Sequence, residues 1–468
     1  MARVRGADPL VSEVGALGKH LALIGFMGAG KSTIGREVAA RTARPFVDTD
    51  AEIERLHGPI PELFERGEPE FRRLEEQLVA ETLAGPPSVI ALGGGAVLSE
   101  KTRERLRAHA FAVQVEVDPD AAWARVSGSD RPLARDEGDF RRLFAERQSL
   151  YAETADASAA DPDGTVLAAL GIRMGHVAPP PISGPLAVVA DQHVLTLHDP
   201  PVEGPVHPVP AGERAKEHDV VERLWNDIEL GRGGTLLAFG GGSTTDVAGF
   251  VAATYLRGVD WIAVPTTLLG QVDAAIGGKT GIDTSRGKNL AGAFHFPRAV
   301  VLDQAYLATL PEAERRAGMA EVVKTGLLSG EKVWELPEAE MVRACAAFKA
   351  GVVLSDPFER EGRRTILNLG HTFAHALESG SGYTVTHGEA VALGLLAALR
   401  LSGLGTEVVE DLLRPAPVSA DRDAAWAALK RDKKGEGVFV LLEEPGKPIV
   451  TTLPDDAARE ALEALIRK

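Results

Sequence analysis

Two histidines four residues apart, His371 and His375, lie in the stretch LNLGHTFAHALE, residues 367–378. Apolar residues recur along it near the period of an α-helix, so we expect one helix over the whole stretch. The two histidines then share a face of that helix, with Glu378 one turn further along it. From this spacing alone, His371, His375 and Glu378 could be three zinc ligands. Alternatively, one histidine binds a metal while the other does chemistry.

A second set of reactive residues is the stretch GFMGAGKST, residues 25–33, which matches G-x-x-x-x-G-K-[ST]. It follows a strand-like run and opens a helical one, which is the context that a phosphate-binding loop needs. Its glycines let backbone N–H groups wrap a phosphate at a helix N-terminus. We expect Lys31 to reach the β- and γ-phosphates of ATP and Ser32 to hold Mg²⁺. The predicted nucleotide contacts are Gly28, Ala29, Gly30, Lys31, Ser32 and Thr33.

The composition limits the classes of protein that can carry these residues. A chain of 468 residues, with 44% hydrophobic and 25% charged residues, predicts a soluble globular protein of two or three domains. A net charge of -16 argues against nucleic-acid binding. No apolar run approaches the ~20 residues of a membrane helix. With no secretory h-region at the N-terminus and a single cysteine, Cys345, we expect a cytoplasmic enzyme with no membrane partner.

Strand-like runs alternate with amphipathic helical runs over the first ~170 residues, which predicts a parallel α/β domain. The expected strands there are 21–25, 45–48, 89–92 and 111–115. A stretch rich in Pro and Gly follows, and a second α/β pattern has expected strands at 185–190, 234–239 and 261–265. From about Glu312 the sequence is mostly helical. We therefore expect a P-loop domain over 1–172, a linker over 173–185, an α/β domain over 186–311 and a helical domain over 312–468.

Residues 18–172 resemble shikimate kinase. The resemblance is carried by the segments DTD (48–50), FRRLE (71–75), LGGGAV (92–97), RPL (131–133) and RQSLY (147–151). It implies that Asp48 acts near Mg²⁺ and that Asp50 orients the attacking hydroxyl. It also implies shikimate contacts by Arg72, Gly94, Gly95 and Arg147, and a catalytic lid role for Arg131 over the ATP phosphates. The competing hypothesis is a kinase of nucleoside monophosphates or of gluconate, and the DTD, FRR and GGG set argues against it.

The segment GGGSTTDVAGF, residues 240–250, follows a predicted strand and opens a helix, which suits a dinucleotide pyrophosphate. Further segments sharpen this signal: 255–283, GKNLAGAF (287–294), AEVVK (320–324), 367–378 and HGEAVALG (387–394). Together they resemble 3-dehydroquinate synthase, from about Leu186 to the end of the chain. The resemblance implies a Rossmann-like α/β domain that binds NAD⁺ and a mostly helical domain that binds metal and substrate.

The resemblance also assigns roles within the second half. It gives Zn²⁺ or Co²⁺ to Glu321, His371 and His387, so that His375 faces the substrate. We prefer this ligand set to the one from spacing alone, because three ligands from separate segments leave positions open for a substrate. The implied NAD⁺ contacts are Asp191, Glu213, Lys216, Gly242, Ser243, Thr244, Thr245, Asp246, Thr266, Thr267, Lys279, Lys288 and Thr309. The implied substrate contacts are Arg257, Asp273, Lys279, Asn289, Lys324, Lys349, Arg364, Asn368 and His375, of which Asp273, Lys279 and His375 take part in catalysis.

The sequence therefore predicts a cytoplasmic fusion of two enzymes of aromatic amino acid biosynthesis. One phosphorylates shikimate with ATP and Mg²⁺, and the other converts 3-deoxy-D-arabino-heptulosonate 7-phosphate to 3-dehydroquinate and phosphate. The resemblance also predicts a homodimer through the second half. Two alternatives stay open: a shikimate kinase fused to a non-catalytic scaffold, and one fused to a metal-dependent polyol dehydrogenase.

The second half departs from the family pattern in several spacings, and those from Glu321 to Lys349 and from His387 to Lys433 are compressed. Asp191 and Glu213 are only 22 positions apart, so a helix usual between them is expected to be missing. The segment DPFEREGRR, residues 356–364, carries about one extra residue, which leaves Glu359 and Glu361 as alternatives for one site position. The segment RDKK, residues 431–434, retains the terminal lysines of the family pattern, and either Lys433 or Lys434 is the one that contacts substrate.

Overall fold

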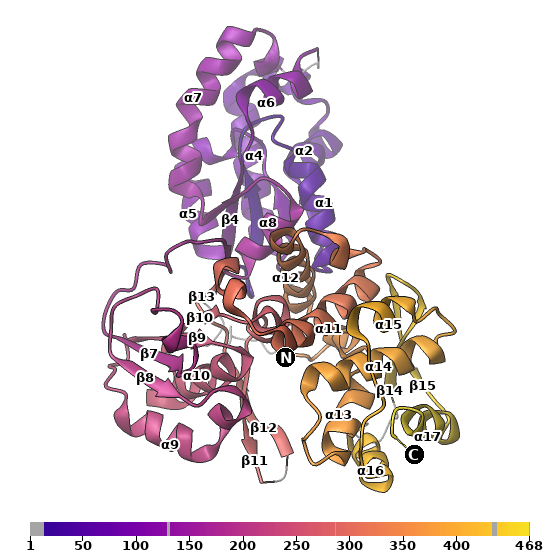
Figure 1. Ribbon diagram of the computed structural model, residues 1–468. Coiled ribbons are helices and arrows are strands. Elements are labelled where there is room, and N and C mark those ends of the chain that lie inside the picture. Colours follow the sequence, from indigo (N-terminus) through magenta and orange to yellow (C-terminus); the bar gives the residue numbers. More distant parts are fainter. Residues whose placement is uncertain (1–13, 129–131, 286, 433–437, 468) are drawn as a thin grey trace, which may run out of the picture. The chain divides into compact units, whose positions relative to one another are not determined.

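The computed structural model of the chain describes residues 14–128, 132–285, 287–432 and 438–467 (Figure 1). The chain divides into two compact units, Met1–Ile172 and Arg173–Lys468. Lys433, Lys434 and Arg131, which the sequence analysis singled out, lie outside the described residues.

The first unit is built on a five-stranded parallel sheet in the order β2-β3-β1-β4-β5. Its strands are β1 (His20–Ile24), β2 (Phe46–Asp48), β3 (Val89–Ala91), β4 (Ala110–Val115) and β5 (Ala157–Ala159). β1 and β3 are buried throughout, as expected of inner parallel strands covered on both faces. The phosphate loop, the DTD segment and the GGG segment follow β1, β2 and β3. Because these strands are parallel neighbours, the three motifs meet at one edge of the sheet.

The helices of the first unit cover this sheet and enclose one main core. Its centre includes Phe26, Val79, Phe140 and Tyr151. The helices are α1 (Lys31–Arg41), α2 (Thr49–His57), α3 (Ile60–Arg66), α4 (Glu68–Leu83), α5 (Glu100–His109), α6 (Pro119–Val126), α7 (Glu137–Thr154) and α8 (Pro162–Ala169).

The second unit begins with a six-stranded sheet in the order β6-β13-β10-β9-β7-β8, in which the pairs from β13 to β8 are parallel. Its strands are β6 (Ile172–Met174), β7 (Leu186–Asp191), β8 (Val206–Val209), β9 (Thr235–Gly240), β10 (Asp260–Pro265) and β13 (Ala299–Leu302). Helices α9 (His218–Asp227) and α10 (Gly242–Thr254) pack near it. An antiparallel pair, β11 (Lys279–Thr284) and β12 (Gly287–Phe294), packs against α10.

The rest of the second unit is mostly helical. Its elements are α11 (Glu312–Ser329), α12 (Glu338–Ser355), η9 (Arg363–Asn368), α13 (His371–Gly380), α14 (His387–Leu401), α15 (Glu407–Leu413), α16 (Arg422–Asp432), β14 (Val438–Glu444), β15 (Lys447–Thr452) and α17 (Asp455–Glu463). α14 is buried along most of its length and packs against both α11 and α13. This packing positions the polar ends of these helices at one cavity, described below.

The structure corrects the expectation of one helix over residues 367–378. Leu367 belongs to the 3₁₀ turn η9, and α13 begins only at His371. Gly370 separates the two elements in a left-handed conformation with φ 78°. A Cβ at Gly370 would lie 2.8 Å from the backbone nitrogen of Leu395, so only glycine fits this crossing of α13 and α14.

Other local differences follow from packing that the sequence pattern does not show. Between Asp191 and β8 the chain forms only the short 3₁₀ turn η3 (Val194–Thr196), in keeping with a missing helix. The first residues of the expected linker belong to β6 at the edge of the sheet. The antiparallel pair of β14 and β15 interrupts the helical C-terminal region, where Val440, Leu441 and Leu442 join its core. None of the described helices is long and apolar enough to cross a membrane.

Candidate active sites

The phosphate loop of the first unit turns between β1 and α1 with no side chain capping the helix. Gly28 and Gly30 have φ angles of 80° and 90°, which glycine adopts without strain. An uncapped helix start of this kind directs its first backbone N–H groups toward an anion. The Nζ of Lys31 donates to the carbonyl oxygens of Gly25 at 2.8 Å and Phe26 at 3.0 Å, which holds the ammonium group over the loop. Ser32 and Thr33 lie in the same first turn.

Two carboxylates meet beside the loop that follows β3. Asp48 ends β2 and caps α2 by accepting from the Ala51 N–H at 3.2 Å, and Asp50 lies in the first turn of α2. A Cβ at Gly93 would fall 2.5 Å from both Asp50 Oδ1 and Glu75 Oε1, so the two carboxylates converge there. Burial raises the pKa of Glu75, against the charge of Arg72. Glu75 is a residue that the sequence analysis missed, although it ends the FRRLE segment.

Two arginines converge on the same loop. Arg72 contacts Glu75 at 2.6 Å, and a Cβ at Gly95 would lie only 2.0 Å from its Nη1. Arg147 is buried and donates to the Gly94 carbonyl oxygen at 3.2 Å, while its Nε has no hydrogen-bond partner. The hydroxyl of Tyr151 donates to the same carbonyl at 2.6 Å. The arrangement gives two guanidinium groups and two carboxylates around one glycine turn, which suits a small anion with several hydroxyls.

The second unit contains a cavity of about 1810 Å³ between its sheet and its helices. Most residues that the sequence analysis assigned to NAD⁺, substrate or metal line it. They are Asp191, Glu213, Lys216, Gly242, Ser243, Thr244, Asp246, Thr266, Thr267, Asp273, Lys279, Lys288, Asn289, Thr309, Lys324, Lys349, Arg364, Asn368, His371, His375 and His387. Three assigned residues do not line it: Thr245 bonds within α10, Arg257 is exposed, and Glu321 is buried behind the two metal-site histidines.

The side of the cavity formed by the sheet has a network of opposite charges. Lys216 is buried and contacts Asp246 at 3.1 Å and Glu213 at 3.7 Å. Burial would lower the pKa of Lys216, but Asp246 and Glu213 raise it above its ordinary value. Ser243 donates to Glu213 at 3.2 Å from the first turn of α10. That helix begins without a side-chain cap, as the phosphate-loop helix does, and can accept a pyrophosphate.

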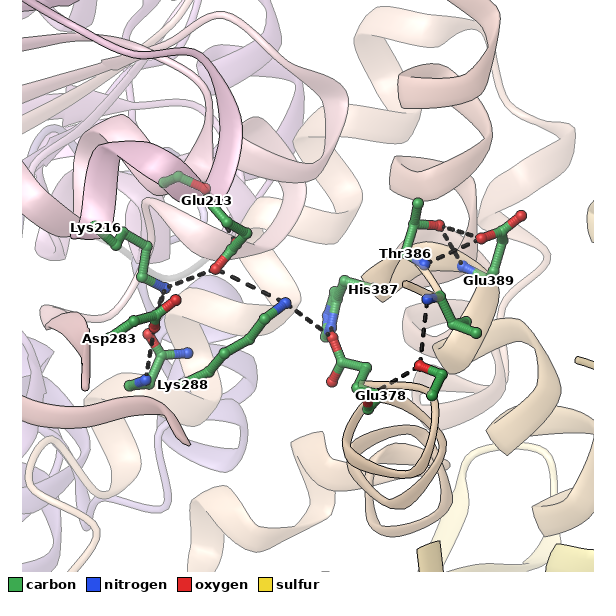
Figure 2. A network of polar contacts seen from close by, with 12 residues as sticks. Glu213, Lys216, Asp283, Lys288, Glu378, Thr386, His387 and Glu389 are labelled. Carbon is green, nitrogen blue, oxygen red and sulfur yellow. Dashed lines mark hydrogen bonds and ion pairs between the residues drawn. The ribbon is translucent and has the colours of Figure 1, made fainter. Parts of the chain in front are cut away.

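Glycines allow the helices that carry the metal-site residues to approach closely. A Cβ at Gly388 would lie 2.3 Å from the Cα of Ala317 on α11, and a Cβ at Gly394 would lie 2.0 Å from the Gly370 carbonyl oxygen. Thr386 and Glu389 form a capping box that fixes the start of α14 at His387 (Figure 2). His371 begins α13, so two helix starts meet the middle of α11 at Glu321.

Glu321, His371 and His387 place one ligand atom each within 4.8 Å of one another, the only such group among the described residues. The Nε2 atoms of His371 and His387 lie 3.4 Å and 3.7 Å from Glu321 Oε1. His375 and Glu378 are not part of this group. The structure therefore brings together the ligand set implied by the resemblance rather than the set suggested by spacing along one helix.

The electrostatics of this group favour a cation. Glu321 is 1% exposed, and its carboxylate forms an ion pair with Lys324. Burial would raise the pKa of Glu321, but Lys324 and the two histidines lower it well below its ordinary value. Burial would likewise lower the pKa of His387, but Glu321 and Glu378 raise it to about 10. One carboxylate and two imidazoles are ligand types that suit a divalent zinc or cobalt ion. Such an ion would displace the proton that the raised pKa places on His387.

A cluster of basic residues lies next to the metal-site residues. Asp273 contacts Lys349 at 2.8 Å and Lys324 at 3.7 Å. Burial would raise the pKa of Asp273, but these two ammonium groups lower it below its ordinary value. Arg364 is buried and donates to the carbonyl oxygens of Gly277 and Pro357, which leaves its Nε without a hydrogen-bond partner. Lys324, Lys349 and Arg364 are thus three buried cations at one side of the cavity, where a substrate anion could bind by displacing the carboxylates that now contact them.

The structure separates the two glutamates that the sequence left as alternatives. Glu359 has φ 53° and forms ion pairs with Lys279 and, at 3.8 Å, with Arg364. Glu361 is exposed and contacts Arg363 at 3.2 Å. Glu359 therefore faces the basic cluster. Its backbone is turned by the carboxylate of Asp356, which accepts from the N–H groups of Arg360, Glu361 and Arg363.

The side chains of His375 and Glu378 lie in different surroundings. His375 is exposed, lines the cavity and lies with its ring centroid 5.7 Å from that of His371. Glu378 is buried and lies 3.5 Å from His387 Nδ1. Sequence spacing placed Glu378 on the histidine face but gave no sign of this contact, because His387 comes from another helix.

Comparisons with known proteins match the two parts of the chain to two different families. The family model of shikimate kinase matches residues 27–167, and those of the N-terminal and C-terminal parts of 3-dehydroquinate synthase match 206–317 and 318–434. The 3-dehydroquinate synthase of Thermobifida fusca is 41% identical over 285 residues, covering 53% of this chain and 76% of the relative. That of Symbiobacterium thermophilum is 43% identical over 296 residues, covering 55% of this chain and 82% of the relative.

A solved structure of 2-epi-5-epi-valiolone synthase from Streptomyces hygroscopicus subsp. jinggangensis, with NAD⁺ and Zn²⁺ bound, superposes with a TM-score of 0.56 at 25% identity. The superposition covers 63% of this chain and 96% of the other. The chain belongs to the 3-dehydroquinate synthase family and carries a shikimate kinase domain in front of its synthase domain.

Proposed function

We propose that both domains are catalytic. The first transfers the γ-phosphoryl group of ATP to shikimate, and the second converts 3-deoxy-D-arabino-heptulosonate 7-phosphate to 3-dehydroquinate and phosphate. The observation that supports this most strongly is the single cavity in which the metal group, the basic cluster and the NAD⁺-type helix start face one another.

In the kinase domain, phosphoryl transfer requires positioning and neutralisation of charge more than covalent chemistry. Bound ATP with Mg²⁺ would supply the phosphoryl group and neutralise its charge, with Ser32 and Asp48 as the metal-side residues. The start of α1 and Lys31 would hold the phosphates. Arg72 and Arg147 would bind the shikimate carboxylate, and Asp50 would orient the attacking hydroxyl.

In the synthase domain, a divalent ion held by Glu321, His371 and His387 would supply Lewis-acid polarisation of a substrate hydroxyl. NAD⁺ would supply a temporary acceptor for the hydride. The basic cluster would bind the phosphate and the carboxylate of the substrate, with Lys324, Lys349 and Arg364 in contact with these anions. Asp273, Lys279 and His375 would orient hydroxyls and stabilise developing negative charge.

The basic cluster also bears on the two alternatives. A polyol dehydrogenase acts on neutral substrates and has no need for several buried cations beside its metal. A non-catalytic scaffold has no need for a guanidinium nitrogen that is buried without a hydrogen-bond partner, because such a group costs stability. The Nε of Arg364 is such an atom. A ligand-binding role accounts for it directly.

One preparation of the full chain can test both activities. Shikimate phosphorylation is followed with ATP and Mg²⁺. Release of inorganic phosphate from the seven-carbon keto-acid phosphate is followed with Zn²⁺ or Co²⁺ and a catalytic amount of NAD⁺. Phosphorylation without phosphate release would show a scaffold, and stoichiometric formation of NADH from a polyol would show a dehydrogenase.

The homodimer and the cytoplasmic location belong to the same proposal. Arg257 is exposed and lies outside the cavity of its own chain, so it is available to contact a second copy of the chain. Light scattering of the purified chain, with and without an Arg257→Ala change, tests the dimer and separates assembly from activity.

Cys345, the single cysteine, is free and buried, which suits a reducing compartment.

A further inference from the structure

Glu378 is a buried acid at the end of a charged network that crosses the cavity of the second unit (Figure 2). Its Oε1 lies 3.5 Å from His387 Nδ1 and 3.5 Å from the Nζ of Lys288 on β12. A buried carboxylate is retained where its partners need it, because burying an acid without them is costly. The contacts of Glu378 therefore point to a role in holding these two groups.

The two histidines of the metal group are supported in matching ways. Each directs Nε2 toward Glu321. The Nδ1 of His371 lies 3.2 Å from the Leu369 carbonyl oxygen, whereas the Nδ1 of His387 faces the Glu378 carboxylate. A metal-binding histidine usually donates its second ring N–H to a carbonyl or a carboxylate, which fixes the ring and its tautomer. The Glu378 carboxylate therefore faces His387 Nδ1 in the same way that the Leu369 carbonyl oxygen faces His371 Nδ1.

Lys288 extends the network to the opposite side of the cavity. Its Nζ lies 3.8 Å from Glu213 Oε2, and the same oxygen lies 3.7 Å from the Nζ of Lys216 (Figure 2). The ammonium group also lies 5.2 Å from the centre of the Tyr383 ring, on the loop that follows α13. A continuous series of opposite charges thereby joins the residues assigned to NAD⁺ with a residue assigned to the metal.

We propose that Glu378 is a positioning residue that orients His387 for the metal and, by holding Lys288, couples metal binding to NAD⁺ binding. This inference rests on the proposed function of the synthase domain. The coupling is reciprocal. If bound NAD⁺ raises the metal affinity by a given factor, bound metal raises the NAD⁺ affinity by the same factor.

The first test measures Zn²⁺ affinity of the full chain by competition with a fluorescent chelator. We expect Glu378→Ala to weaken Zn²⁺ binding about 10- to 100-fold. Glu378→Gln should weaken it less, because the amide oxygen can still accept from His387 Nδ1. The matched control is Glu389→Gln, which removes a negative charge two residues from His387 but keeps an amide oxygen that can accept from Thr386 in the capping box. Its Zn²⁺ affinity should stay within about twofold of the wild type. Wild-type affinity in Glu378→Ala, or an equal loss in the Glu389 variant, would overturn the positioning role.

The second test measures Zn²⁺ affinity with and without saturating NAD⁺, and NAD⁺ affinity with and without Zn²⁺. We expect a coupling factor of about fivefold or more in the wild type. The factor should fall close to one in Glu378→Gln and in Lys288→Met, because neither retains the ion pair. Full coupling in Glu378→Gln would overturn the link.

Thermal unfolding in excess chelator checks that each variant is folded, and the isosteric glutamine variant guards against loss of the fold. Failure of the wild type itself to bind Zn²⁺ or NAD⁺ would refute the proposed function of the synthase domain. Normal binding by the wild type and by both Glu378 variants would refute the present inference alone.

Discussion

The kinase site is built around the backbone of short loops, whereas the synthase site is built from long side chains that cross a cavity. In the first, the phosphate loop and the GGG turn leave neighbouring strands of one sheet, and side chains gather around them. In the second, the ligands come from α11, α13, α14 and β12, and most of its charges neutralise one another. The kinase site therefore offers an uncapped helix start to its ligand, whereas a ligand of the synthase site must displace ion pairs that already exist.

The sharpest test of this contrast is whether the two sites fail independently. Lys31→Met should lower the rate of shikimate phosphorylation roughly 10³-fold, because it removes the positive charge that would neutralise the transferred phosphoryl group. Formation of dehydroquinate by the same preparation should stay within about twofold. Lys101→Met is the matched control in the same unit, because Lys101 is exposed and its ion pair, within the described part of the chain, is with Glu76 at 3.5 Å. Loss of both activities from a folded Lys31 variant would contradict independent sites.

A second prediction separates ligands from neighbours within the synthase site. His371→Ala and His387→Ala should each weaken Zn²⁺ binding at least about 100-fold, because a three-ligand site tolerates no missing ligand. His375→Ala should keep near-stoichiometric Zn²⁺ and lose turnover, since its ring lines the cavity outside the metal group. Elemental analysis after dialysis measures the metal. A metal-free His375 variant beside a loaded His387 variant would show that the ligand set is wrong.

A third prediction compares the two arginines of the kinase site. Each charge-assisted bond to the shikimate carboxylate is worth about 1.5–3 kcal/mol, so Arg147→Ala should raise the KM for shikimate about 10- to 150-fold with little change for ATP. Arg72→Ala should do less, because Glu68 and Glu75 already compete for its guanidinium group. Steady-state kinetics with both substrates measures this. The exposed Arg73 is the control, and an equal rise in the KM for ATP would argue against a carboxylate-binding role.

The smallest predicted effect concerns the ion pairs that a synthase ligand must displace. Glu359→Gln removes the partner of the half-exposed Lys279, and an exposed pair is worth about 0–1 kcal/mol. The KM for the keto-acid phosphate should therefore fall up to about fivefold at low salt. Glu361→Gln should leave the KM unchanged, because the Glu361 carboxylate contacts only the exposed Arg363 among the described residues. A rise in KM for Glu359→Gln would mean that this carboxylate binds substrate instead of competing with it.

The sequence by itself determined the features that depend on neighbours along the chain. Residues 25–33 contain every atom of the phosphate loop, so a nine-residue pattern between a strand and a helix was enough to predict it. The apolar runs of β1, β7, β9 and β10 were readable for the same reason, since inner parallel strands are buried on both faces. Resemblance to a family added the metal ligands, which no local spacing could give.

The tertiary structure decided the features that depend on contacts between distant segments. Glu75 and Tyr151 became part of the kinase site because α4 and α7 deliver them to the GGG turn. Glu359 was separated from Glu361 only by the turn that Asp356 organises. Glu378 sits at ligand spacing from His371 along α13, yet it contacts His387 instead, because glycine crossings bring α14 against α13 and α11. Which partner a side chain contacts depends on how closely the backbones of different helices can approach. The spacing of residues along one helix does not reveal that distance.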